Sequence, residues 1–328
     1  MKRTLLLICT LLCANVLFAQ EQLAALKHND SISVYYGANA FEQAYNAAAN
    51  GDIITLSDGI FSTPQYVQKG ITVRGNGAVA DTARKKIGTY FMERFMLRNL
   101  GDSLQFSAEG IYFKDFSVTN SLGIKLAKCF FESIGNVKNA QIINCIILNG
   151  SVNPDEESSN TFVNCILKDI SYLNSTAGPV HFLPTYSNCI NCILIGRERT
   201  SSDYVLYNNC IIISPNGGQT LHSVSLNSIL IGFTGTSSPA SSGNVVMNLS
   251  DVFENWDGES FPTDLETYVL KSSVSNSILG LDGREVGIFG GAIPFDWTPT
   301  YSVIKRLDVP NTPDENGMLN IDVEFLTE

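Results

Sequence analysis

Charged residues are scarce in this chain. They make up 16% of its 328 residues, below the usual quarter. Lys and Arg form no dense stripe, the formal net charge is −11 and the pI is near 4.8. Such a surface argues against non-specific binding to nucleic acids or anionic membranes. The hydrophobic fraction of 44% is ample for a core, which excludes intrinsic disorder.

Long apolar runs are missing after the first 20 residues. The run Leu5–Phe18 follows Lys2 and Arg3 and ends before Ala19 and a polar stretch. This pattern predicts a secretory signal over residues 1–19. Its removal leaves a formal charge of −13, since it carries two basic residues and no acidic ones. We therefore expect an exported mature chain without a transmembrane segment, in the periplasm, on the outer surface or outside the cell.

A short phrase, Asn-Cys followed by apolar residues, recurs along the chain. Its copies are Asn144–Leu148, Asn164–Leu167, Asn191–Ile195 and Asn209–Ile213, with a looser copy at Lys128–Phe131 and degraded ones at Asn227–Ile231 and Asn276–Leu279. Successive copies are 16 to 27 residues apart, except for a last step of 49 that has room for two coils and an insertion. Short β-branched runs at this period predict one strand per turn of an all-β solenoid, a parallel β-helix.

The repeated residues suit the corner and the interior of such a solenoid. Asn tolerates the left-handed conformation of a tight bend, and its amide can bond the Asn of the next coil. Because strands of successive coils lie about 4.8 Å apart, identical residues stack. The predicted asparagine ladder is Asn144, Asn164, Asn191, Asn209, Asn227 and Asn276. The predicted interior file of small soft hydrophobes is Cys145, Cys165, Cys192 and Cys210.

Export permits disulfides among the six cysteines that remain after residue 19. In-register side chains point the same way, however, so a mostly reduced, buried ladder is favoured. Cys189 and Cys192 have the spacing of a redox or metal pair, but no second pair or nearby His accompanies them.

Both residues after each Cys are apolar, although side chains alternate faces along a strand. One of the two columns therefore points outward, unless the bend resets the phase. A loop or the tail covers that column, or it is an exposed stripe for a partner. We favour cover.

The opening of the chain carries a family resemblance. Phe41, Ala44, Tyr45 and Ala48 recur at helical spacing, and the strand Ile53–Leu56 follows. This opening resembles the pectin-lyase-like right-handed β-helix proteins, in which a short helix caps the first coil. Two later segments are also similar to that family, a regular coil at Glu109–Phe116 and a closing phrase at Asp282–Gly291. The resemblance spans about residues 33–291.

The resemblance implies a single-stranded right-handed parallel β-helix over residues 20–291, with an N-terminal capping helix. It does not imply an activity, because the superfamily includes lyases, hydrolases, esterases, epimerases and adhesins. Residues 292–328 contain four prolines and two strand-like runs, Ser302–Val309 and Leu319–Phe325. We expect a C-terminal cap or β-hairpin tail there, with a docking or export appendage as the alternative.

The catalytic motifs known in this family are absent from the chain. The chain has three histidines, none in a Gly-His-Gly phrase, and no Asp-Asp pair. The Ca²⁺-binding carboxylates and the Arg or Lys base of pectate-lyase-like enzymes have no matching motif here, and the acid-and-serine phrase of alginate lyases and the methylesterase signatures are absent too. These absences argue against a known enzyme of this fold. We expect no cofactor or metal, with Ca²⁺ reserved for the case of a lyase.

One charged group remains a candidate for catalysis. Lys168, Arg197 and Arg199 follow strands of neighbouring coils and could supply a base. The acidic residues that could gather beside them and bind substrate are Asp155, Glu156, Glu157, Asp169 and Glu198. The alternative is ordinary solvated charge on loops.

Three smaller features are ambiguous. His181 lies between two apolar residues, and we expect it to be a surface or half-buried side chain rather than a general base. Trp256 and Trp297 lie outside the repeats and suit either sugar stacking or core packing. A basic group, expected in an insertion before the regular coils, suits an anionic sugar or plain solvation; it comprises Arg84, Lys85, Lys86, Arg94 and Arg98.

Three functional hypotheses follow. The first is a non-catalytic envelope or surface protein whose side wall binds a polysaccharide or a cell-envelope protein. The second is a divergent polysaccharide lyase that acts on uronic-acid polymers through the charged group. The third is a purely structural envelope or assembly component.

Overall fold

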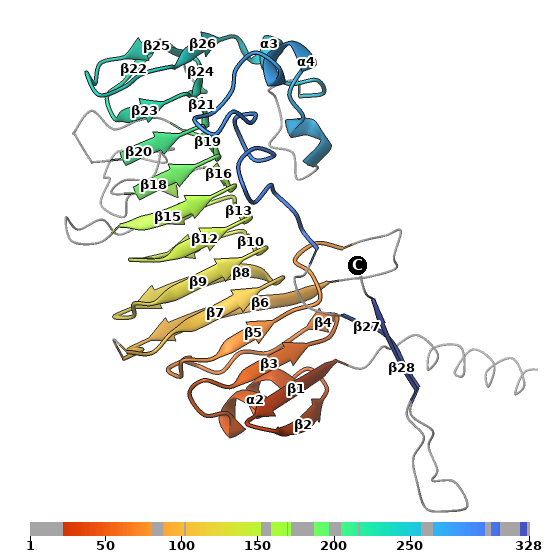
Figure 1. The fold of residues 1–328 in the computed structure, drawn as a ribbon. Helices are drawn as coiled ribbons and strands as arrows, with labels where there is room; N and C mark the ends of the chain where they lie inside the picture. Colours follow the sequence, from red (N-terminus) through yellow and green to blue (C-terminus); the bar gives the residue numbers. More distant parts are fainter. Residues whose placement is uncertain are drawn as a thin grey trace, which may run out of the picture.

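The computed structural model describes residues 22–80, 88–101, 103–151, 159–168, 170–171, 187–196, 205–215, 217–256, 265–298, 303–308 and 322–326. The chain is mostly β and forms a parallel β-solenoid of about eight turns, with a few short helices (Figure 1). The predicted all-β solenoid is confirmed.

Two long sheets form the walls of the solenoid. Sheet A has 11 strands in the order β2-β1-β3-β5-β7-β9-β12-β15-β18-β20-β23. Its strands are β1 Leu23–His28, β2 Ser31–Tyr36, β3 Ile53–Leu56, β5 Thr72–Arg74, β7 Phe106–Glu109, β9 Ile124–Ala127, β12 Gln141–Ile143, β15 Asn160–Val163, β18 Ser187–Ile190, β20 Val205–Asn208 and β23 Val224–Leu226.

Sheet B has 13 strands. They are β4 Gly59–Ile60, β6 Thr89–Arg98, β8 Tyr112–Thr119, β10 Phe130–Phe131, β11 Ile134–Gly135, β13 Ile146–Ile147, β14 Gly150–Ser151, β16 Ile166–Lys168, β17 Ile170–Ser171, β19 Ile193–Ile195, β21 Ile211–Ile213, β24 Ile229–Ile231 and β26 Val245–Met247. Its pairings are parallel throughout.

Smaller elements complete the chain. The short strands β22 Gln219–Leu221 and β25 Phe233–Thr236 pair with each other. Helices α3 Leu249–Val252 and α4 Ser272–Ser275 and the 3₁₀ helix η1 Leu265–Tyr268 follow the last coil. In the tail, β27 Val303–Asp308 and β28 Asp322–Leu326 pair antiparallel, so the predicted pairing of the two tail strands is confirmed.

The N-terminal end is capped as the sequence predicts. Helix α2, Ala40–Ala47, buries Phe41, Ala44 and Tyr45 against the first coils. Strand β1 lies between β2 and β3 and is antiparallel to both. The cap covers apolar core that the open end of a solenoid would otherwise expose.

The repeat phrase alternates between the interior and the outer face of sheet B. Cys145 and Ile147 are buried in the interior, whereas Ile146 belongs to a separate apolar cluster outside it. The same alternation holds in the other copies up to β24. All six described cysteines are free and fully buried, which agrees with the reduced ladder predicted above; they are Cys129, Cys145, Cys165, Cys189, Cys192 and Cys210.

The corner between the two sheets is a column of left-handed residues. Its members have φ between 46° and 56° and are Lys128, Asn144, Asn164, Asn191, Asn209 and Asn227. The predicted stacking column is therefore confirmed as far as Asn227. Three of its amides, those of Asn144, Asn164 and Asn209, have different partners from those predicted, because they bind the chain's own C-terminal segment. Asn164 donates to Ile288 O at 2.7 Å and to Gly290 O at 2.9 Å.

Residues 278–298, here called the strap, run along this corner beside sheet B (Figure 1). Asn209 accepts from Leu281 N at 3.0 Å. Further along, Asn144 donates to Pro294 O at 3.3 Å, and Lys128 pairs with Asp296 at 3.1 Å. The strap therefore descends the solenoid from the coil of Asn209 to that of Lys128.

The strap covers the outward column of sheet B. In-register residues of that column, among them Ile166, Ile193 and Ile211, pack with Val286 and Ile288. The predicted cover is confirmed, and for these coils the loop segment Asp282–Gly291, rather than the tail over 292–328, provides it. The alternative of a wholly exposed apolar stripe is wrong for these coils.

The last predicted repeat is wrong. Asn276 follows helix α4 with φ −88°, so it is not a left-handed corner residue. The 49-residue step contains one further solenoid strand, β26, and then helices in its described part, instead of two coils. The phrase Asn276–Leu279 is a local coincidence of composition.

Candidate functional site

Of the charged group predicted for catalysis, the structure describes Lys168. This residue ends β16 on the outer side of sheet B, half-buried and in register with Ile195. The other members lie outside the described residues, so their assembly stays a prediction; they are Asp155, Glu156, Glu157, Asp169, Arg197, Glu198 and Arg199.

The described residues of the basic group lie on a strand of the solenoid and not in the predicted insertion. Arg94 and Arg98 lie on strand β6 of sheet B. Arg94 pairs with Asp115 at 2.6 Å, and Arg98 lies 4.6 Å from the centre of the Tyr66 ring. Both are occupied by contacts within the chain. Residues 84–86 of this group, and His181, lie outside the described ranges.

The tryptophans pack in the outer apolar cluster. Trp256 is 9% exposed and lies edge-on to Phe253 at 5.1 Å and to Tyr268 at 5.8 Å between ring centres. Trp297 is edge-on to Phe295 at 4.9 Å. Of the two open readings, core packing is the one that fits Trp256.

The outer face of sheet A carries polar side chains in register. Ser107 pairs with Lys125, Lys125 with Gln141, Gln141 with Thr161, and Thr161 with Asn188. Lys125, Gln141 and Asn188 are exposed, and the other two are half-buried. We call these five residues the polar wall. Hydroxyl, amide and ammonium groups thus repeat at steps of about 4.8 Å up the solenoid.

Sequence reasoning missed this wall, although a signal exists. Each wall residue from Lys125 onward stands three positions before a corner residue, Lys128 in the first case and Asn191 in the last. The four residue types differ, so they share polarity rather than identity. Aligning the repeats on the corner asparagine would have brought them into one column.

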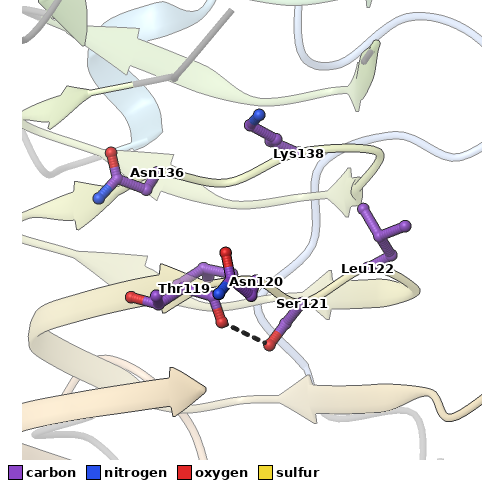
Figure 2. A pocket seen from close by; sticks show the side chains of 7 residues that line it. Thr119, Asn120, Ser121, Leu122, Asn136 and Lys138 are labelled. Atoms are coloured by element: carbon purple, nitrogen blue, oxygen red, sulfur yellow. Dashed lines mark hydrogen bonds between the residues drawn. The ribbon is translucent and has the colours of Figure 1, made fainter. Parts of the chain in front are cut away.

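A pocket of about 390 Å³ lies at the edge of this wall, where the chain turns from sheet B into sheet A. Figure 2 shows Asn136 and Lys138 on one coil and Thr119, Asn120 and Ser121 on the coil before it. Val118 and Leu122 complete the lining. Strands β9 and β12, which carry Lys125 and Gln141, start directly after these bends.

The polar groups of the pocket are partly fixed. Ser121 donates its hydroxyl to Thr119 O at 3.0 Å, and Asn120 donates to Asn99 Oδ1 at 3.3 Å. Asn120 and Asn99 thus make the bond between stacked amides that was predicted for the opposite corner. The buried Oδ1 of Asn136 has no hydrogen-bond partner among the described residues.

Aromatic residues mark the lower outer face of sheet B. Tyr112 stacks on Phe130 at 5.1 Å and donates its hydroxyl to Glu132 Oε1. Burial, followed by this hydrogen bond, raises the pKa of Tyr112 above its ordinary value. Tyr112 is therefore held protonated, as a hydrogen-bond donor rather than a base.

No cluster of three or more His, Cys, Asp or Glu side chains within the described ranges is placed to hold a metal ion. In the same ranges, no helix combines the length and apolar character that crossing a membrane requires.

Comparison with known proteins assigns no family. No protein-family model matches the chain, and no curated protein matches it.

Proposed function

We propose that this chain is an exported, non-catalytic envelope or surface protein that binds a glycan along the polar wall. The pocket at the edge of the wall receives part of the same ligand. We also propose, from the sequence resemblance, that the solenoid is a right-handed β-helix of the pectin-lyase-like type.

The contrast between the two outer faces carries the proposal. Sheet B presents an apolar column that the strap covers, whereas sheet A presents a file of hydrogen-bonding groups that are exposed or half-buried. The strap leaves the polar wall of sheet A uncovered, and the half-buried apolar column beside it, which includes Ile143 and Val163, offers a surface on which a sugar ring can pack. An extended polymer with repeating hydroxyl groups meets Lys125, Gln141, Thr161 and Asn188 at equal steps.

Charge at the wall bears on the class of glycan. The chain as a whole is acidic, which repels polyanions at long range. Lys125 and Lys138 place ammonium groups at the wall and at the pocket. They supply local charge for a carboxylate, while the amides and hydroxyls serve a neutral sugar equally well.

Binding to a polysaccharide panel tests the proposal. Purified residues 20–328 are run through native gels that contain neutral or uronic-acid polymers, with and without Ca²⁺. We expect retardation in at least one gel and its loss in the double variant Lys125→Ala, Gln141→Ala. The matched control is Lys114→Ala, an exposed lysine on the outer side of sheet B. No retardation on any polymer, or equal loss in the control, contradicts the proposal.

The same preparation tests the lyase hypothesis. Lyase cleavage of a uronic-acid polymer creates an unsaturated product that absorbs in the ultraviolet. We expect a flat absorbance trace. A rise that Lys168→Ala abolishes would replace the binding proposal with the lyase.

Export has its own test. Mass spectrometry of the mature chain should find an N-terminus at Gln20, within a few residues. Retention of residues 1–19 on the protein outside the cytoplasm contradicts this part of the proposal.

A further inference from the structure

Strand β2 is an edge strand without the usual protection. It is the terminal strand of sheet A and pairs only with β1 in the described structure. Ile32, Val34 and Tyr36 on its outer face are 69%, 42% and 56% exposed. The strand contains no charged residue and no proline. Edge strands of soluble proteins are normally blunted by such residues, by bulges or by cover, because open edges pair with other chains.

The direction of the free hydrogen-bonding groups follows from the β1–β2 hairpin. A two-residue turn joins His28 to Ser31, and Gly37 N donates to Gln22 O at 2.8 Å. Hydrogen-bonded pairs alternate along an antiparallel ladder. The backbone N–H and C=O groups of Ser31, Ser33 and Tyr35 therefore point toward β1. The N–H and C=O groups of Ile32, Val34 and Tyr36 therefore point to the open edge.

This edge is complementary to itself. When two β2 strands pair antiparallel with Val34 on the two-fold axis, Val34 faces Val34 and Ile32 faces Tyr36. All of these positions have edge-directed backbone groups, so the ladder is satisfied on both strands. The facing side chains are β-branched or aromatic, and such cross-strand pairs stabilise sheets. The uncharged strand lets two acidic molecules meet without like charges in the ladder.

We infer that two copies of this chain dimerise through β2, in an isologous antiparallel pairing centred on Val34. The dimer joins the two copies of sheet A into one continuous sheet across the axis. This inference rests on β2 alone and is independent of what the polar wall binds.

Mass in solution tests the inference. In sedimentation equilibrium, we expect purified residues 20–328 to have twice the monomer mass, and the variant Val34→Lys to have the monomer mass. The control is Val246→Lys on β26 at the other end of the solenoid, where Val246 is 51% exposed. That variant should stay dimeric. A monomeric parent protein, or a dimer that Val34→Lys leaves intact, overturns the inference.

Cysteine cross-linking tests the register and does not depend on the lysine variant. Hydrogen-bonded antiparallel partners have Cα atoms about 5.5 Å apart, within the range of a disulfide. With oxidised glutathione as electron acceptor, two Val34→Cys chains should join through one disulfide. Ile32→Cys alone should not cross-link, whereas a mixture of Ile32→Cys and Tyr36→Cys should. Cross-linking of Ile32→Cys with itself but not of Val34→Cys contradicts this register.

Discussion

At the residue scale, the corner asparagines have two functions. Each adopts a left-handed conformation that most residues avoid, and several bind the strap with their side-chain amides. Lys128 stands at the same corner with φ 53° and holds the strap through Asp296. The corner is thus both a bend in the coil and the attachment line of the C-terminal segment.

Asn164 should be the costliest corner asparagine to replace. It is 1% exposed, has φ 49° and makes two hydrogen bonds to the strap. We expect Asn164→Ala to lower the free energy of unfolding by about 3 kcal/mol, from backbone strain and lost hydrogen bonds. Asn164→Gly removes the bonds without the strain and should cost less, about 2 kcal/mol. Chemical denaturation measures both.

The control for this series is Asn276→Ala, outside the column, with an expected change within about 0.5 kcal/mol. Equal losses at Asn164 and Asn276 would show that the corner has no special role.

The buried cysteines should be inert in the folded protein. Burial raises the pKa of the Cys145, Cys165, Cys189 and Cys210 thiols, which suppresses the reactive thiolate. We expect no reaction of the native mature chain with a thiol reagent over minutes, and six thiols to react on unfolding. A native protein that reacts at once, or an unfolded one with fewer than six thiols, contradicts the buried reduced file.

At the element scale, the strap is the part of the chain that completes the solenoid. It approaches the corner so closely that a Cβ on Gly291 would overlap the Asn191 side chain. Gly291 has φ +75°, and Gly283 has φ +73° with open space around it. The two glycines share the backbone conformation and differ in contact with the corner.

This pair of glycines gives a controlled test of the strap. Gly291→Ala and Gly283→Ala carry the same backbone strain, but only the first pushes the strap away from the corner. We expect limited proteolysis to cut within 278–298 faster in Gly291→Ala than in Gly283→Ala. Equal cleavage rates would mean that the strap does not depend on this contact.

The Lys128–Asp296 pair makes attachment of the strap depend on pH. Burial alone would raise the pKa of Asp296, but hydrogen bonds from Thr298 and the Lys128 ammonium bring it below its usual range. The pair therefore contributes stability above the unfolded pKa of about 4, and this contribution is lost as the pH falls through the lower folded value.

The variant Lys128→Asn keeps a residue suited to φ 53° and removes the ion pair. We expect a lower thermal midpoint than in the parent protein at pH 7 and a smaller difference near pH 3. A difference that stays constant with pH rules out the ion pair as its cause.

Local repetition is why much of this architecture was predictable from the sequence. The phrase at Asn144 and its copies predicts the strands, the left-handed corner and the cysteine file, because each depends on neighbours at a fixed period. The partners of the amides were not predictable in this way, since Asn164 binds Ile288 across 124 residues of chain. Asn276 shows the opposite failure, because a matching phrase without flanking coils does not form a corner.

At the scale of the whole molecule, the described solenoid has two unlike walls. The strap covers the apolar column of sheet B, whereas the outer side of sheet A carries the polar wall beside a half-buried apolar column that includes Ile143 and Val163. The candidate site is therefore an extended wall with a pocket at its edge, rather than an enclosed cleft. An extended wall of this kind matches the repeating groups of a polymer, the ligand class proposed above.

Polysaccharide binding by the parent protein and the wall variant, with ultraviolet absorbance recorded on the same samples, tests the central claim most directly. We predict binding to at least one polymer of the panel, weakened about tenfold by Lys125→Ala with Gln141→Ala, unchanged by Lys114→Ala and accompanied by a flat absorbance trace. Binding that the wall variant leaves intact, or an absorbance rise that shows cleavage, would contradict a non-catalytic glycan-binding wall on sheet A.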